Sequence, residues 1–283
     1  MPPMELVTWN VQWGLGCDGH VDLERIVRTA RALCDADVFC FQEISRGFPA
    51  LDGGEDQPAA LAALLPGYRP IFRPAVEVMN PDGNLQTFGN MILSRLPVLR
   101  IASHLLPWPA DEVRSMQRQA LEVVVAASFG PVSVATCHLE FHSVAQRAAQ
   151  VERLRELHEE TTRRGRLAFR DIGTGPYRTT DAPVGAIVCG DFNLEPDDPA
   201  YARMQEPVST GVAPFVDAWT ARHGTVPHAP TAGVGDAEQW PQGPHCRDFI
   251  FVSQDLAERI TDMQVDVDTT ASDHQPIALT LAP

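Results

Sequence analysis

Short apolar runs that alternate with helix-like segments are the feature that most limits how this chain can fold. The strand-like runs span residues 6–11, 37–42, 91–94, 98–103, 120–127, 132–138, 186–190, 249–252 and 277–281. Residues 23–33, 59–65 and 143–162 have the spacing or composition of helices. Because short strands and a few helices bury their apolar faces in packed layers, we predict an α/β fold with two sheets packed face to face and covered by helices.

Three polar segments interrupt this alternation, at residues 79–89, 169–183 and 228–245. Segments of this length in a compact fold are usually either functional or disordered. Two of the tryptophans, Trp108 and Trp240, lie in Pro-rich loops, where each can stack on a ring of a ligand or pack beneath its loop. The chain contains neither an internal repeat nor a clean linker, so we predict one domain over residues 1–283.

The acidic balance of the chain restricts its partners. The net charge is -15, whereas proteins that grip long duplex DNA usually present a basic surface. Six cysteines without a Cys-x-x-Cys pair favour small buried thiols over a disulfide framework or a zinc site. No run approaches ~18 apolar residues, and the N-terminus lacks a signal-peptide pattern, so we predict no membrane span and a cytoplasmic location.

Polar residues stand where the apolar runs end. They are Asn10 and Glu43 after the first two runs, His138 after residues 132–137, Asp191 and Asn193 after residues 186–190, and Asp273 and His274 before the last run. A polar side chain just beyond a buried strand lies at the rim of the core, where several strand ends converge. Active sites are commonly built at such places.

The residue types in this set suit metal-assisted cleavage of a phosphoester. Mg²⁺ prefers oxygen ligands, usually one or two carboxylates together with water and substrate phosphate, and Glu43, Asn10 and Asp273 can supply such oxygens. Asp191 can take a proton from an attacking water that Asn193 orients. The two histidines of the set can donate hydrogen bonds to non-bridging phosphate oxygens.

The order of these motifs resembles that of a known enzyme family. The segments TWN, FQE, GNMILSR, CHLE, GDFN, RDFIFVS and SDH follow one another between Thr8 and His274. GDFN or SDH alone is common, but the ordered set resembles the endonuclease/exonuclease/phosphatase superfamily, to which DNase I belongs, over nearly the whole chain. The resemblance implies a four-layer α/β sandwich in which two mixed β-sheets pack face to face between helical layers.

The resemblance also implies a role for each matching residue. It places Asn10 and Glu43 at a divalent cation, Mg²⁺ or Mn²⁺, and makes Asp273 a metal ligand or the neighbour of one. It makes Asp191 the base that activates water and Asn193 the residue that orients this base. These assignments agree with the chemistry of the residue types.

Three further roles follow from the resemblance. It makes His274 a phosphate-binding group and Asp248, in RDFIFVS, the carboxylate that orients the His274 ring. It matches His138 to the histidine of a Thr-His-Leu motif in DNase I. Some apurinic-site endonucleases have Asp where this chain has Gln12, so the resemblance does not extend to a second metal position.

Four other residues are candidates for substrate binding, namely Asn90 in GNMILSR, Arg118, Glu140 in CHLE, and Arg147 on the helix that follows. The arginines can contact a substrate phosphate, and Glu140 can steady His138. Each of the four also has a structural alternative, as a turn residue, a helix cap or a surface salt bridge.

We therefore predict a hydrolase of phosphodiesters or phosphomonoesters, whose partner is a phosphorylated small molecule or a nucleic acid and which needs no protein partner. A nuclease that acts on DNA or RNA ends or damaged sites remains an alternative, although the acidic charge disfavours it. A catalytically silent binding protein of the same fold is the second alternative. Such a protein is expected to lose one of Glu43, Asp191, Asn193 or His274, and all four are present. Substrate choice is expected to depend on the three polar segments.

Overall fold

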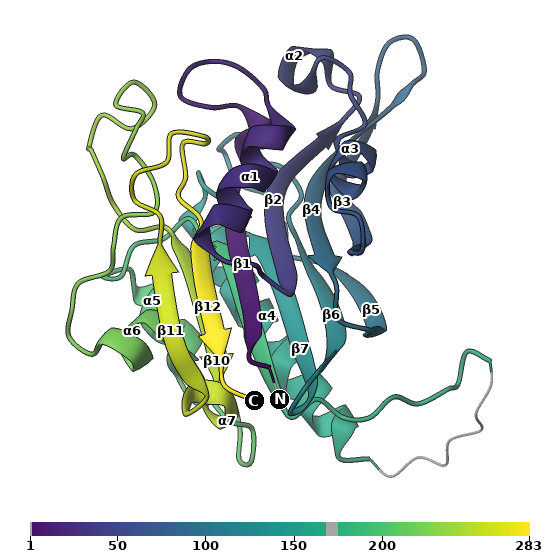
Figure 1. The fold of residues 1–283 in the computed structure, drawn as a ribbon, viewed down its shortest axis with the longest axis vertical. Coiled ribbons are helices and arrows are strands. Elements are labelled where there is room, and N and C mark those ends of the chain that lie inside the picture. The colour runs from purple at the N-terminus through teal and green to yellow at the C-terminus, as the bar shows by residue number, and fades with distance from the viewer. Residues whose placement is uncertain (1, 168–174) are drawn as a thin grey trace.

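The computed structural model describes residues 2–167 and 175–283, which build two six-stranded sheets between helices (Figure 1). The first sheet contains β1 (Met4–Asn10), β2 (Val38–Arg46), β3 (Arg69–Met79), β4 (Leu85–Ser94), β11 (Ile260–Val265) and β12 (Ile277–Leu281). The second contains β5 (Val98–Leu105), β6 (Gln119–Ala127), β7 (Gly130–His138), β8 (Gly185–Asp191), β9 (Phe215–Asp217) and β10 (Asp248–Ser253). The helices are the 3₁₀ turn η1 (Gln12–Gly14), α1 (Leu23–Leu33), α2 (Pro49–Asp52), α3 (Gln57–Leu64), α4 (Val144–Gly165), α5 (Pro199–Gln205), α6 (Ala218–His223) and α7 (Gln254–Ala257).

Both sheets are mixed and share one pattern of strand directions. The strand order is β11-β12-β1-β2-β4-β3 in the first sheet and β5-β6-β7-β8-β10-β9 in the second. In each sheet one central pair is parallel, β1 with β2 and β7 with β8, and the other neighbours are antiparallel. Because the two parallel strands run in the same direction, their carboxyl ends lie side by side at the same end of the sheet.

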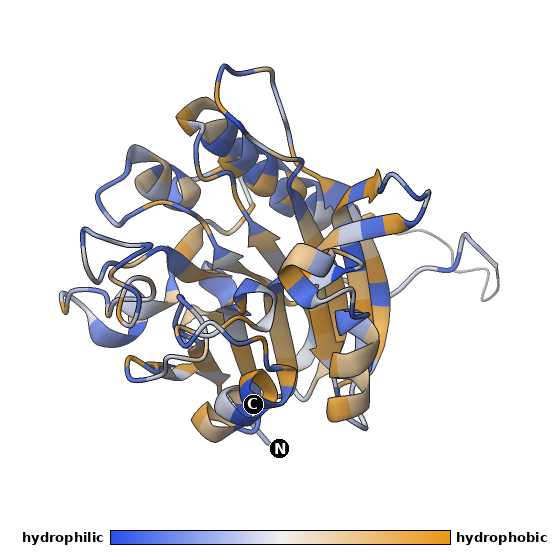
Figure 2. Ribbon diagram, turned by 90° about the horizontal axis from the view of Figure 1, so that it is seen from above, coloured by the Kyte–Doolittle hydropathy of each residue, from blue (hydrophilic) through white to orange (hydrophobic). Residues whose placement is uncertain are grey.

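The alternation of side chains along the strands fills the space between the sheets. In β2, Cys40 faces inward and belongs to one buried cluster with Val134 and Cys189 of the second sheet. Its neighbours Phe39 and Phe41 face the other way, into the layer between the first sheet and its helices. Seen from above in Figure 2, the strands between the helices are mostly hydrophobic and the connecting loops mostly hydrophilic.

Helices cover the outer face of each sheet. Ile26 of α1 and Leu61 of α3 are buried with Phe41 against the first sheet. Leu154 of the long helix α4 is buried with Phe251 against the second sheet. The order of layers is helix, sheet, sheet and helix, so the predicted four-layer α/β sandwich is confirmed (Figure 1).

Two local predictions differ from the structure or lie partly outside the described residues. The loop predicted at residues 79–89 is wrong over most of its length, because β3 continues to Met79 and β4 begins at Leu85. β3 was not predicted from the sequence, because Pro70 and Pro74 interrupt its strand pattern. The prolines are tolerated in the structure because β3 is an edge strand. In the loop predicted at 169–183, residues 169–174 lie outside the described residues.

The connection between β4 and β5 joins the two sheets. The strands predicted on either side of Leu96-Pro97 exist, but β4 lies in the first sheet and β5 in the second. The predicted hairpin exists as β6 and β7, paired from Ala120 opposite Cys137 to Ala127 opposite Gly130. No helix in the described part of the chain is both long enough and apolar enough to cross a membrane.

Candidate active site

The two parallel strand pairs end close together, across the space between the sheets. Asn10 ends β1, and Glu43 follows the β2 residue with which Asn10 is paired. In the second sheet, His138 ends β7 and is paired with Asp191 at the end of β8. The amide Nδ2 of Asn10 donates to Glu43 Oε1 at 2.9 Å and to Asp191 Oδ2 at 3.0 Å, so this side chain links the two sheets. The structure thus brings the strand-end residues together.

A shift of strand register presents Glu43 to the cavity. The pairing of β2 with β4 slips between Phe41 and Ile44, and Glu43 between them has a φ of 62°. Such a bulge redirects one side chain out of the regular alternation. Gly89 stands opposite Ile44, and a Cβ atom at Gly89 would lie 2.4 Å from the carbonyl oxygen of Arg73. Glycine is therefore required where β3 approaches this bulge.

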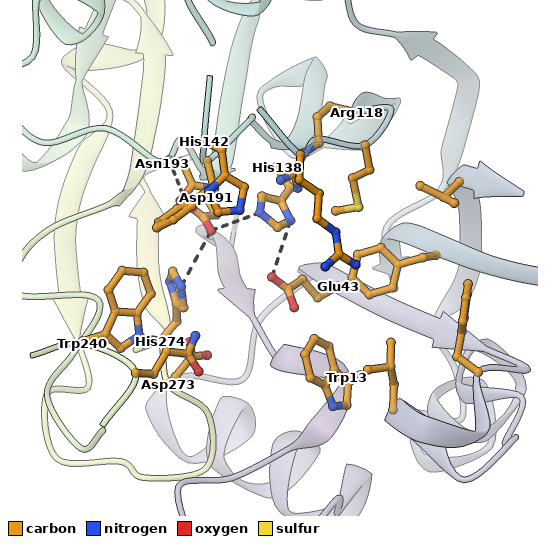
Figure 3. Close-up of a pocket in the computed structure, with 18 residues that line it drawn as sticks. Trp13, Glu43, Arg118, His138, His142, Asp191, Asn193, Trp240, Asp273 and His274 are labelled. Atoms are coloured by element: carbon orange, nitrogen blue, oxygen red, sulfur yellow. Dashed lines mark hydrogen bonds and ion pairs between the residues drawn. The ribbon is translucent and has the colours of Figure 1, made fainter. Parts of the chain in front are cut away.

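Asp191 contacts two histidines and the backbone of Asn193 in the cavity (Figure 3). Its Oδ2 lies 3.4 Å from His138 Nε2 and 3.8 Å from His274 Nε2, and its Oδ1 accepts from the backbone N–H of Asn193 at 2.9 Å. Burial acts to raise the pKa of Asp191, but the charge of His274 and the hydrogen bond from Asn10 bring this pKa below its usual value. Asp191 is therefore a carboxylate at neutral pH.

The two histidines beside Asp191 differ in charge. Burial opposes protonation of His274, but the carboxylates of Asp248 and Asp273 hold its pKa well above the usual value. Burial and the nearby charge of Arg118 lower the pKa of His138 to about 3. At neutral pH His274 is a cation that can donate from both ring nitrogens, whereas His138 is neutral and can donate from one.

Asp248 fixes the orientation of the His274 ring. Its Oδ2 lies 2.8 Å from His274 Nδ1, and both side chains are buried. Burial raises the pKa of Asp248 to about 6, although the charge of His274 opposes this shift. With Nδ1 engaged by Asp248, the other ring nitrogen of His274 points toward Asp191 (Figure 3).

Glu43 differs from Asp191 because its pKa is raised. Burial and the negative charge of Asp273 raise the pKa of Glu43 to about 7, against the hydrogen bond from Asn10. Asp273 Oδ2 accepts from Gln239 Nε2 at 2.7 Å and from Trp240 Nε1 at 3.1 Å. Burial and this second carboxyl group disfavour the ionised form of Glu43, and a divalent cation would stabilise it.

Two groups of side chains have the chemistry to hold a cation. Asp191, Asp248 and His274 offer ligand atoms within 4.8 Å of one another. However, Asp248 and His274 already share a hydrogen bond, and the positively charged His274 ring repels a cation. Glu43 with Asp273 fits better, because Mg²⁺ and Mn²⁺ favour oxygen ligands.

Asn10 is oriented as a hydrogen-bond donor. Its Nδ2 faces Glu43 and Asp191, while its Oδ1 accepts from the backbone N–H of Gln12 at 3.1 Å. The predicted ligation of a metal through Asn10 would require its amide to turn over. As placed, Asn10 holds the two carboxylates in position.

Comparison with known proteins identifies the family. The sequence model of the Endonuclease/Exonuclease/phosphatase family matches residues 7–274. The chain belongs to this family. Members of the family hydrolyse phosphoesters and generally depend on divalent metal ions. A comparison with curated protein sequences found no match.

Solved structures of family members share the fold at low sequence identity. An endonuclease/exonuclease/phosphatase from Beutenbergia cavernae is 23% identical, with a TM-score of 0.70 over 100% of this chain and 72% of its own. The human Nocturnin catalytic domain is 19% identical, with a TM-score of 0.64 over 99% of this chain and 93% of its own. A mannosyl-6-phosphatase from Bacteroides thetaiotaomicron is 17% identical, with a TM-score of 0.63 over 99% of this chain and 100% of its own. At these identities the likeness concerns the fold alone.

Of the four candidate substrate-binding residues, Arg118 lines the cavity. Its Nε donates to Glu140 Oε2 at 3.1 Å, and its buried Nη1 has no hydrogen-bond partner among the described residues. The other three are engaged elsewhere. Glu140 is buried behind Arg118, Arg147 donates to the carbonyl oxygen of Glu140 at 2.9 Å, and Asn90 donates to the carbonyl oxygen of Gln119 at 3.2 Å. These contacts support the strands and loops around the cavity.

The backbone near the cavity is strained. Among the described residues, the non-glycine residues with positive φ are Gln12, Trp13, Glu43 and Asn193. Such left-handed conformations cost roughly 1–3 kcal/mol each and persist at functional sites. Three of these residues line the cavity, and Gln12 directly precedes Trp13. Trp13 was not predicted as a site residue, and the signal available for it was Gly14, at which the first apolar run of the sequence breaks.

Proposed function

We propose that this chain is a divalent-metal-dependent phosphoester hydrolase in which Asp191 activates the attacking water. The observation that carries this proposal is the position of Asp191 among His138, His274 and Asn10, with its pKa lowered. A general base must be ionised at the working pH and within hydrogen-bond reach of a water molecule in the cavity. Asp191 is ionised at neutral pH and lines the cavity in which the water would lie.

In this proposal Glu43 and Asp273 hold the cation. The cation, Mg²⁺ or Mn²⁺, would polarise a phosphate oxygen and offset the negative charge that develops during the reaction. The raised pKa of Glu43 supports this assignment, because burial and the negative charge of Asp273 disfavour the ionised carboxyl group and a bound cation would offset both effects.

The other residues act on the phosphate and the water. The water gives its proton to Asp191 while its oxygen forms a bond to phosphorus, and the ester oxygen on the opposite side leaves with the electron pair of its P–O bond. His274, held by Asp248, donates from Nε2 to a non-bridging oxygen. His138 can donate one hydrogen bond to the same group, and Asn193 holds Asp191 through its backbone N–H. No covalent enzyme intermediate is expected.

Hydrolysis of bis-p-nitrophenyl phosphate and p-nitrophenyl phosphate tests the proposal. Turnover is measured with Mg²⁺, Mn²⁺ or EDTA for the wild type, for Asp191→Ala and for Asp82→Ala, a control at an exposed turn. We expect metal-dependent turnover in the wild type and the control and its loss in Asp191→Ala. The ratio of diester to monoester hydrolysis separates nuclease-like from phosphatase-like use. Turnover that persists in EDTA or in Asp191→Ala would contradict the proposal.

A catalytically silent binding protein would give a different result. It would be stabilised by Mn²⁺ in thermal unfolding, because binding to the folded state raises apparent stability. It would nevertheless hydrolyse neither these compounds nor a panel of nucleic acids and phosphorylated metabolites. That combination would favour the binding protein over the hydrolase.

A further inference from the structure

The cavity is larger than a phosphate group requires. Its volume is about 610 Å³, which lies within the ~300–1,000 Å³ typical of sites for drug-sized ligands. The proposed catalytic residues form only part of its lining. Six other lining residues form what we call the apolar wall: Trp13, Phe48, Leu51, Val76, Phe88 and Met116.

A strained turn holds Trp13 in the apolar wall. Trp13 has a φ of 45° and a ψ of 29°, which is unusual for a large side chain. Its carbonyl oxygen accepts from Gln57 Nε2 at 2.6 Å, and the turn begins with the hydrogen bond from the Gln12 N–H to Asn10 Oδ1. The same residue, Asn10, contacts both Glu43 and Asp191, so the position of the Trp13 indole is tied to the catalytic residues. In Figure 3 this indole faces Glu43 from the side opposite His138.

Phe88 and Val76 enter the wall from the edge of the first sheet. The register between β3 and β4 shifts between Pro74 and Val76, and Val76 pairs with Phe88 beyond this shift. The ring centroids of Trp13 and Phe88 lie 6.5 Å apart with an interplanar angle of 55°. Neither ring belongs to the three buried core clusters of the described residues. Both rings instead line the cavity, where they can contact a ligand.

The chemistry of the wall selects the kind of group that can lie against it. Apart from the indole N–H of Trp13, its side chains offer no strong hydrogen-bond donor or acceptor. The hydroxyl groups of a sugar would lose water there without gaining partners, which is costly. An aromatic ring would instead remove apolar surface from water and could pack against the rings of Trp13 and Phe88.

We propose that the apolar wall is the subsite for an aromatic group of the substrate, so that the enzyme prefers phosphoesters that carry a ring close to the phosphate. This inference rests on the proposed function, because it assumes that the phosphate lies at Asp191 and His274. The charged residues would bind the phosphate group of the substrate, and the apolar wall would bind its organic group.

Paired ligands that differ in one ring test the inference. The first measurement is the affinity of 2-phenylethylphosphonate and of ethylphosphonate in the presence of Mn²⁺, by titration calorimetry. Neither compound has a scissile ester oxygen, so binding is measured whether or not the protein is a hydrolase. The second is kcat/KM for 2-phenylethyl phosphate, ethyl phosphate and mannose 6-phosphate, whose leaving groups are all alcohols. We expect the phenyl compounds to be favoured by at least about tenfold in both measurements.

Three variants locate the preference. Phe88→Leu and Trp13→Leu remove a ring from the wall and should each lower the ratio of phenyl to ethyl affinity severalfold. Trp108→Leu is the matched control, because Trp108 is a half-exposed tryptophan that lies outside this cavity. It should keep the wild-type ratio. If Trp13→Leu does not fold, Phe88→Leu alone still tests the position of the ring.

The outcomes separate this inference from the proposed function. Equal affinity for the two phosphonates, a preference for mannose 6-phosphate, or a preference lost in Trp108→Leu but kept in Phe88→Leu would overturn the inference. Selective binding of the phenyl phosphonate without turnover of any ester would support the subsite while refuting the hydrolase. Metal-dependent turnover without a preference for the ring would do the reverse.

Discussion

Glu43 and Asp191 are carboxyl groups at equivalent ends of the two sheets, and they share the amide of Asn10 as a hydrogen-bond donor. Their pKa values nevertheless shift in opposite directions. Burial acts to raise the pKa of Asp191, but the His274 cation outweighs this effect and the pKa is lowered. Burial and the charge of Asp273 raise the pKa of Glu43 to about 7. Around Asp191 the protein thus supplies a balancing cation, the His274 ring that precedes β12, whereas around Glu43 it leaves negative charge that a ligand can balance.

This difference suggests distinct roles for the two carboxyl groups. In the proposed mechanism, Asp191 is a base that is ionised with or without metal. Glu43 gains its full negative charge only when a cation is bound. Pairs of titratable groups whose environments separate their pKa values commonly have distinct roles in catalysis. The predictions below test whether Glu43 and Asp191 divide in this way.

The largest expected effect is on turnover. Asp191→Asn keeps the shape of the side chain but removes the base, and should lower kcat by about 10²–10⁴-fold at every Mn²⁺ concentration. Glu43→Gln should instead shift the dependence of activity on Mn²⁺ to higher concentrations, with part of the activity recovered at high metal. The measurement is kcat at a series of Mn²⁺ concentrations. Recovery of Asp191→Asn by added metal would show that both carboxylates serve the cation.

A smaller effect is expected on the stability of the metal-free protein. Unfolded Glu43 ionises near 4.5 but folded Glu43 near 7, so the folded state binds the extra proton between these values. Wild-type Glu43 therefore destabilises the fold increasingly as pH rises from 4.5 to 7, by up to about 3 kcal/mol. Glu43→Gln removes this dependence, so its stability relative to wild type should rise over that range.

Urea unfolding in EDTA at pH 5 and pH 8 measures this difference. Glu77→Gln, at an exposed position of β3, is the control and should leave the pH dependence of wild type unchanged. Saturating Mn²⁺ should narrow the gap between Glu43→Gln and wild type at pH 8, because only the wild type keeps the carboxylate. A stability difference that is the same at both pH values would contradict the raised pKa of Glu43.

Asp248→Asn should have a smaller effect on activity than loss of the base. Burial lowers the tendency of His274 to hold a proton, and the Asp248 carboxylate opposes this. Without that charge the pKa of His274 falls. The His274 ring then loses its proton at a lower pH than in wild type. We expect kcat/KM to fall about 10–100-fold at pH 8 and less at pH 6. The measurement is the pH profile of kcat/KM, and an equal loss at both pH values would argue that Asp248 acts only through structure.

The sequence predicted the part of the site that lies at strand ends. Apolar runs reveal where buried strands stop, and Glu43, His138 and Asp191 follow such runs directly. The orientation of Asn10 could not be predicted, because it depends on a hydrogen bond to the backbone of Gln12. The different protonation states of the two histidines depend on burial and on charged residues that are far away in the sequence but close in space. The sequence reveals neither.

The apolar wall escaped prediction for another reason. Phe88 lies in an apolar stretch and resembles a core residue, and Trp13 follows a strand without any periodic pattern. Only bulges and left-handed backbone turn these side chains toward the cavity. The edge strand β3, which supplies Val76, was concealed by its prolines. Sequence patterns thus revealed the polar residues of the cavity but not its apolar wall.

The smallest expected effect is that of substituting Asp217, which tests whether a lowered pKa alone identifies a catalytic aspartate. Like Asp191, it is a buried aspartate whose pKa is lowered. Burial acts to raise this pKa, but Asp217 Oδ2 accepts from His228 Nε2 at 2.8 Å and from Thr220 Oγ1 at 2.5 Å, and these bonds lower it. It caps α6 and does not line the cavity. A lowered pKa alone would therefore not distinguish a base from a helix cap.

Asp217→Asn should leave kcat unchanged and lower the free energy of unfolding at pH 7 by about 1–2 kcal/mol. The sign follows from the lowered pKa: the Asp217 carboxylate stabilises the fold above its unfolded pKa, and this contribution is lost as pH falls through the folded value. The difference in stability between the variant and wild type should therefore become smaller as pH falls below 3.8, the ordinary pKa of the carboxyl group. Urea unfolding at pH 7 and pH 3, with kcat measured on the same preparations, checks both expectations. A loss of kcat comparable to that of Asp191→Asn would mean that buried, ionised aspartates matter to this enzyme through the fold, and that the position of Asp191 in the cavity has no special role.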